Sequence, residues 1–278
     1  MWAALLALGA SLTWGTSNFV AGVESRRRSV WTVTAVSQIA AAFGAGVTLL
    51  IAGQAVPDLR HTLWPVVGGI ASAVGIVAFY RALAIGAMSV VAPIIATAAV
   101  VPVAVGLLLG ERPGVAAYAG MALAVAGVAL VSWSDRREDG QRAHRSAILL
   151  AVFTALVFGV MLVGLDLGDR DSPYWTVFYT RIASVFVILA YFAASRRRFD
   201  LTARIVPALA GLGLLLTVAN LLFTVATTIG YLSIVAILGS IGPVFTTGYA
   251  QALLGERLTR RQWVGFATVF AGVILLTV

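Results

Sequence analysis

Residues 134–165 read SDRREDGQRAHRSAILLAVFTALVFGVMLVGL, a charged stretch followed by 20 residues without a charge. A helix of that length spans about 30 Å, which is the thickness of the hydrocarbon core of a bilayer. We therefore predict a transmembrane helix at 146–165 and a linker outside the lipid at 134–145. Of the 278 residues, 60% are hydrophobic and 11% are charged, against about 25% charged in soluble domains. This composition excludes a soluble enzyme, a disordered protein and a nucleic-acid binder.

Nine further apolar runs, separated by charged residues or by glycine and proline, have the length of a membrane span. The first of them is long and lacks a basic n-region, so we interpret it as a helix and not as a signal peptide. At Gly86 and Gly230 the connections are almost absent, and we expect each glycine to end its helix in a left-handed conformation. The chain is thus predicted to be an all-α integral membrane protein with ten transmembrane helices at 2–23, 30–52, 63–86, 88–109, 113–133, 146–165, 173–194, 205–229, 231–254 and 259–278.

Arginine is distributed unevenly between the predicted loops. The loops after the odd-numbered spans hold fourteen arginines, and those after the even-numbered spans hold three. Because basic residues gather in cytoplasmic loops, we predict that the odd-numbered loops are cytoplasmic and that both termini are extracytoplasmic. The net charge of +8 then reflects membrane topology and does not indicate a nucleic-acid partner.

The two halves of the chain match each other after a shift of 144 residues, which becomes 145 near the end of the fourth span. Matching pairs are Trp14-Gly15 with Phe158-Gly159, Ile85-Gly86 with Ile229-Gly230, and Gly110-Glu111-Arg112 with Gly255-Glu256-Arg257. A unit of five spans crosses the membrane an odd number of times, so its second copy is inverted, as in many transporters. We predict two inverted five-helix repeats, at 1–133 and 146–278, joined by a cytoplasmic linker at 134–145.

Several motifs occur in an order and spacing that resemble a known family. They are WGTSNFVAG at 14–22, YRAL at 80–83 followed by Ser89 and Pro93, LLLGER at 107–112 and ALLGERL at 252–258. In these residues the chain resembles the EamA-type ten-helix transporters of the drug/metabolite transporter superfamily. The resemblance implies a central cavity, lined mainly by helices 1, 3, 4, 6, 8 and 9, that carries small organic solutes. Such proteins often have an arginine early in the second helix of each repeat; here Arg181 matches it, whereas Ser37-Gln38 stands at the equivalent place.

Polar side chains at bilayer depth are costly and usually face protein or a water-filled cavity. This criterion selects the candidate substrate-binding residues Trp14, Asn18, Gln38, Arg181, Thr217, Asn220 and Ser240. An alternative stays open, because such groups also hydrogen-bond neighbouring membrane helices. For Arg181 the two possibilities are a substrate carboxylate and a structural hydrogen bond to a loop or backbone.

Prolines and glutamates mark the fourth and fifth helices of each repeat. Pro93 and Pro243 lie inside the fourth helices, where a proline removes a backbone donor, so both are candidate gating residues. Glu111 and Glu256 come just before the fifth helices, and we expect them to cap the N-termini of those helices.

Every acidic residue and both histidines are predicted at helix ends or in loops. A proton-coupled pump usually needs a titratable group in its pathway, so a passive facilitator or exchanger is favoured over a proton antiporter. The chain has no cysteine, and neither a metal site nor a cofactor is expected.

The sequence therefore favours an alternating-access transporter of amino acids or metabolites, an exporter or a facilitator, in the cell membrane. Its expected partners are the lipid bilayer and a small-molecule substrate. No obligatory protein partner is expected, since one duplicated chain holds both halves of a cavity. Multidrug efflux by proton antiport is the main alternative, and a non-transporting scaffold or an intramembrane enzyme has much less support.

Overall fold

The computed structural model describes residues 1–86, 91, 94–131, 141–195, 205–254 and 259–277. Within these ranges the chain is helical and has no strand. Residues 94–96, η2 and α5 form the fourth apolar unit and α10 with α11 forms the ninth, so the described helices make the ten units expected from the sequence. The elements are α1 (Trp2–Arg27), α2 (Val30–Ala52), η1 (Leu59–His61), α3 (Leu63–Ile85), η2 (Thr97–Ala99), α5 (Val100–Leu108), α6 (Val115–Val131), α7 (Gln141–Asp166), α8 (Pro173–Ser195), α9 (Val206–Ile229), α10 (Leu232–Gly239), α11 (Gly242–Leu254) and α12 (Arg260–Thr277).

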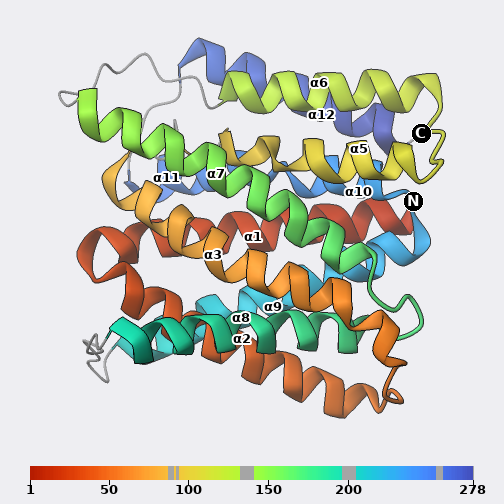
Figure 1. The fold of residues 1–278 in the computed structure, drawn as a ribbon. Coiled ribbons are helices and arrows are strands. Elements are labelled where there is room, and N and C mark those ends of the chain that lie inside the picture. Colours follow the sequence, from red (N-terminus) through yellow and green to blue (C-terminus); the bar gives the residue numbers. More distant parts are fainter. Residues whose placement is uncertain (87–90, 92–93, 132–140, 196–204, 255–258, 278) are drawn as a thin grey trace.

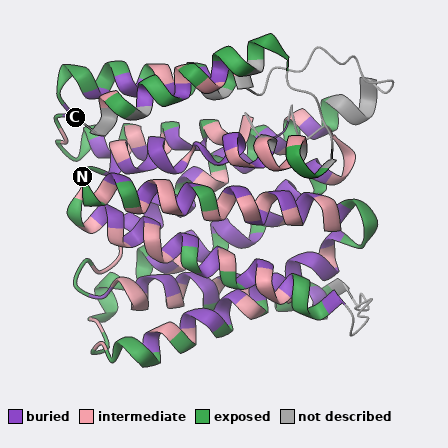
Figure 2. Cartoon of the chain, turned by 180° about the vertical axis from the view of Figure 1, so that it is seen from behind, coloured by how far each residue is buried: buried purple, intermediate pink, exposed green. Residues whose placement is uncertain are grey.

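The outer surface of the bundle is apolar. Six of the described helices are long and apolar enough to cross a membrane, and three shorter apolar helices accompany them. Large side chains such as Phe43, Leu50, Phe186 and Phe270 are exposed, while buried residues concentrate on the inward faces of the central helices (Figure 2). Lipid accepts such a surface, whereas a soluble monomer rarely exposes one. The fold is that of an integral membrane protein.

The first helix of each repeat packs against the third helix of the other repeat. α1 packs against α9, and α7, the equivalent of α1, packs against α3. The close approaches are equivalent too: a Cβ atom added at Gly86 would lie 2.6 Å from the Cβ of Ala147, and one at Gly230 would lie 2.6 Å from the Cβ of Ala3. Ala3 and Ala147 are separated by the repeat shift, so these contacts relate the two copies by an approximate twofold axis.

The expected left-handed conformation of Gly86 and Gly230 is wrong. Both residues are extended, with φ and ψ of −123° and 168° at Gly86 and −147° and 167° at Gly230. Glycine occupies these positions because the neighbouring helix leaves no room for a side chain. A left-handed glycine does end α2, where Gly53 has a φ of 60° and donates to the carbonyl of Leu49 at 3.1 Å.

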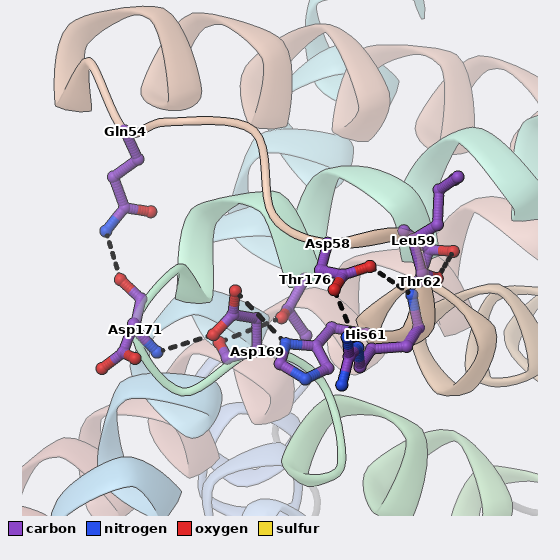
Figure 3. A network of polar contacts seen from close by, with 9 residues as sticks. Gln54, Asp58, Leu59, His61, Thr62, Asp169, Asp171 and Thr176 are labelled. Carbon is purple, nitrogen blue, oxygen red and sulfur yellow. Dashed lines mark hydrogen bonds and ion pairs between the residues drawn. The ribbon is translucent and has the colours of Figure 1, made fainter.

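Both chain termini lie at the same end of the bundle (Figure 1), which we call the terminal face. The connections after α2 and α7 meet there, as Figure 3 shows. His61 Nδ1 lies 3.6 Å from a carboxylate oxygen of Asp169, and the Gln54 amide donates to the carbonyl of Asp171 at 3.1 Å. The two repeats are thus joined by polar contacts at the terminal face, opposite the end that carries Arg26–Arg28.

Candidate substrate cavity

A cavity of about 110 Å³ lies between the repeats, beside the middle of α1 and α9. Six of the residues selected from the sequence line it: Trp14, Asn18, Arg181, Asn220, Ser240 and Pro243. Ser72, Tyr80 and Thr246 also line it and were not selected. For Tyr80 the signal was present in the sequence, since it begins the YRAL motif at 80–83.

Trp14 and Asn220 form one polar pair in the cavity wall. The Trp14 indole Nε1 donates to Asn220 Oδ1 at 3.2 Å, and its ring packs on Phe223 with the centroids 5.5 Å apart. Asn220 is 1% exposed, and its Nδ2 has no hydrogen-bond partner among the described residues. The Asn220 oxygen is therefore occupied by Trp14, whereas the Asn220 Nδ2 group is a buried donor without an acceptor among the described residues.

Arg181 is the charged residue of the cavity wall, and it is 1% exposed. Its Nη1 donates to Gln38 Oε1 at 3.2 Å and its Nη2 to the carbonyl of Leu216 at 2.9 Å. Its Nε has no hydrogen-bond partner among the described residues, and none of the ion pairs found there includes Arg181. Two neutral oxygens thus hold a buried cation in place without neutralising it.

Gln38 and Thr217 do not line the cavity, in contrast to the expectation that they face it. Gln38 accepts from Arg181 and also from the Ser184 hydroxyl at 3.2 Å. The Thr217 hydroxyl donates to the carbonyl of Ala41 at 2.6 Å and so joins α9 to α2. Both side chains are buried in helix contacts behind the wall, which is the interhelical role left open above.

The ninth helix is broken beside the cavity. α10 ends at Gly239 and α11 begins at Gly242; the Ser240 N–H bonds to the carbonyls of Ala236 and Ile237 at 3.0 and 3.1 Å. Pro243 is the second residue of α11, where the missing N–H costs no helical hydrogen bond. It therefore starts a new helix and does not bend the interior of one. Pro93, the other proposed gating residue, lies outside the described residues.

α11 is held close to α1. The Thr246 hydroxyl donates to the carbonyl of Gly15 at 3.0 Å. A Cβ at Gly15 would lie 2.7 Å from the carbonyl oxygen of Gly242, so glycine is needed for the two backbones to meet. The break in the ninth helix is thereby fixed against the cavity wall.

Glu111 caps a different helix from the one expected. Its carboxylate accepts from the backbone N–H groups of Leu232 at 2.5 Å and of Ser233 at 3.0 Å. These residues begin α10 in the second repeat, so the glutamate joins the repeats at the terminal face instead of capping the helix that follows it. The equivalent Glu256 lies outside the described residues.

Asp166 ends α7 near this contact and is 4% exposed. Arg170 approaches its Oδ1 at 3.6 Å, but this oxygen has no hydrogen bond among the described residues. Thr227 and Glu111 are also close enough to interact with it. Asp166 is at a helix end, as the sequence predicted, yet it is inside the protein.

Two inverted helical repeats that enclose a cavity beside a broken helix are typical of one class of membrane protein, the transporters. Comparison with known proteins places the chain within that class. Residues 1–133 and 145–278 each match the profile of the EamA-like transporter family, and the chain belongs to this family. It is a membrane transporter of the drug/metabolite transporter superfamily.

Two further similarities concern the repeat and the fold. An uncharacterized protein of Methanocaldococcus jannaschii is 26% identical over 133 residues, which are 48% of this chain and 97% of that protein. That relative is therefore about as long as one repeat. A solved crystal structure superposes with a TM-score of 0.78 at 16% identity and covers 99% of this chain and 98% of the other, so the whole ten-helix fold is shared.

Proposed function

We propose that this protein moves small organic solutes across the cell membrane by alternating access, as an exporter or a facilitator. The observation that carries the proposal is the cavity between the repeats, which is lined by residues of both. Its wall includes the end of α10, the start of α11, and residues in and next to η2. Both irregular helices therefore meet the substrate, and an irregular helix can change shape without breaking regular hydrogen bonds.

The terminal face holds the gate in this proposal. Glu111 fixes the start of α10, and the connections after α2 and α7 contact each other at the same face. Opening on this side requires α10 to separate from α5, which releases two charge-assisted hydrogen bonds. We place this face outside the cell, from the distribution of arginine in the sequence.

Net flux is expected to follow the substrate gradient, because every described residue that lines the cavity is non-acidic. Proton antiport is the second candidate, and the buried Asp166 supports it. A carboxylate of this kind, without a hydrogen bond on Oδ1 among the described residues and close to the gate residue Glu111, can accept a proton. A pH step imposed on liposomes separates the two candidates.

Single-cysteine labelling tests whether solvent reaches the cavity. The chain contains no cysteine, so Ser240→Cys introduces one thiol in the cavity and Phe186→Cys one on the lipid-facing surface. A membrane-impermeant thiol reagent is expected to label Ser240→Cys and not Phe186→Cys, because a thiolate forms only where water enters. Counterflow of a panel of solutes into liposomes tests transport itself. The proposal fails if no solute accumulates beyond the level in protein-free liposomes.

A further inference from the structure

The half of the cavity wall formed by α1 and α9 is more polar than the half formed by α3 and α7, although the duplication relates these helices. At three pairs of positions related by the shift of 144 residues, the residue on α1 or α9 is polar and its equivalent is apolar: Trp14 against Phe158, Asn18 against Leu162, and Asn220 against Ile76. Ser72 against Leu216 is a pair of the reverse kind. All eight of these residues line the cavity. Divergence of the repeats has therefore given a symmetric fold an amphipathic cavity, which suits a solute with one polar end and one apolar end.

The polar half presents donors without matching acceptors. Arg181 Nε and Asn220 Nδ2 are the unpartnered buried nitrogens of cavity-lining residues in the described part of the chain. Each belongs to a side chain that is 1% exposed. Leaving such donors unsatisfied is costly in a low-dielectric interior. Because Arg181 and Asn220 line the cavity, a ligand there can supply the acceptors.

The charge of the cavity wall also favours an anionic ligand. The guanidinium of Arg181 remains protonated at physiological pH, and its two partners are neutral oxygens. The first residues of α11, Gly242 and Pro243, also line the cavity, and the N-terminus of this 13-residue helix carries a partial positive charge. No acidic residue of the described chain lines the cavity, so a ligand ammonium group would find no counter-charge.

We propose that the cavity binds a small monocarboxylate with an apolar body, in preference to a zwitterion, a neutral solute or an organic cation. This inference rests on the transport function proposed above and names its substrate class. The carboxylate takes hydrogen bonds from Arg181 and Asn220, and the apolar body lies against the half that contains Ile76 and Phe158. A multidrug role directed at organic cations is disfavoured by the same arrangement.

Four probes that share one branched apolar body test the charge preference in the unmodified protein. They are 4-methylpentanoate, its neutral amide, leucine, and 3-methylbutylamine, measured by calorimetric binding to purified protein and by counterflow into liposomes. A charge-assisted hydrogen bond gained by the carboxylate corresponds to an affinity about tenfold or more above that of the amide. Leucine and the amine are expected to bind more weakly than the carboxylate. Protein-free liposomes correct for passive permeation of the protonated acid.

Two arginine variants test whether Arg181 causes the preference for the carboxylate. Arg181→Gln keeps an amide donor near the carbonyl of Leu216 and removes the charge, so the preference for the carboxylate over the amide is expected to disappear. Arg60→Gln removes the same charge from an exposed side chain and is expected to leave the preference unchanged. If Arg181→Gln keeps the full preference, the inference is overturned. Should it fail to fold, the four-probe comparison in the unmodified protein decides alone.

The outcomes also distinguish the inference from the transport proposal. Saturable counterflow of leucine or the amine at least as strong as that of the carboxylate leaves transport standing and overturns the anion site. Carboxylate binding without flux of any probe supports the anion site and contradicts transport.

Discussion

Glu111→Gln is the substitution with the clearest expected effect on the gate. The glutamate accepts two backbone N–H groups at the start of α10. The amide keeps one acceptor oxygen, places an NH₂ group against the second donor and loses the negative charge at the helix N-terminus. A hydrogen bond to a charged group contributes about 1.5–3 kcal/mol, and the charge–dipole interaction about 0.3–1 kcal/mol. A net loss of about 2 kcal/mol would shift the gate about 30-fold toward the open state.

The assay measures how fast a thiol behind this contact is labelled. Ser233→Cys places it on α10 at a side chain that is fully buried and whose hydroxyl has no partner among the described residues, so the exchange is mild. Labelling from outside by an impermeant reagent is expected to be about 30-fold faster when Glu111→Gln is added. Asp58→Asn removes a carboxylate from the same face without touching α10 and is expected to leave the rate unchanged.

A second reporter separates gate opening from general destabilisation. Ser25→Cys lies on α1 at the opposite end of the bundle and is 4% exposed. If Glu111→Gln accelerates labelling at Ser25→Cys and Ser233→Cys equally, the substitution has loosened the whole fold and the gate assignment is wrong. An unchanged rate at Ser233→Cys would refute it as well.

Three further predictions follow from the packing, the topology and the acidic residues. Gly15→Ala is expected to lower the free energy of unfolding in detergent by about 1–3 kcal/mol, because the backbones of α1 and α11 meet there. Gly211→Ala is the control: an added Cβ meets nothing within 4 Å, so the substitution should be neutral or slightly stabilising. Reporters active only in the cytoplasm are expected to be silent at both termini, and activity at either one contradicts the proposed topology. After subtraction of the uptake by protein-free liposomes, accumulation of substrate is expected to be insensitive to a pH step; a response that disappears in Asp166→Asn would instead establish proton antiport.

Several predicted spans agree with the helices, because bilayer thickness limits their length. The prediction of 30–52 coincides with α2, and that of 205–229 differs from α9 by one residue. The linker predicted at 134–145 is too long, since α7 begins at Gln141. Contacts between distant residues could not be predicted in the same way. Glu111 accepts a hydrogen bond from Leu232, which is 121 positions away in the sequence. The helix that a carboxylate caps is the one that lies next to it in the folded protein, which need not be the next helix in the chain.

The candidate site was predictable in composition and only partly in geometry. The cost of polarity in lipid selected several residues that line the cavity, among them Trp14, Arg181 and Asn220. It could not tell a residue that faces the cavity from one that faces another helix, since both satisfy the same requirement. Gln38 and Thr217 were therefore selected for the cavity, although each is used by a neighbouring helix.

The pairing of Arg181 with Gln38 has a reason in the duplication itself. α2 and α8 are equivalent helices that pack against each other, and the shift of 144 residues puts Ser37 opposite Arg181. An arginine in both repeats would bring two guanidinium groups together near the approximate twofold axis. Two like charges 4 Å apart repel by about 4 kcal/mol at an effective dielectric constant of 20, so such a pair would need an anion able to neutralise both. With Ser37-Gln38 in the first repeat, a neutral acceptor occupies that place and one positive charge remains. A single negative charge on the substrate is then sufficient to balance the site, which favours a monocarboxylate over a dianion.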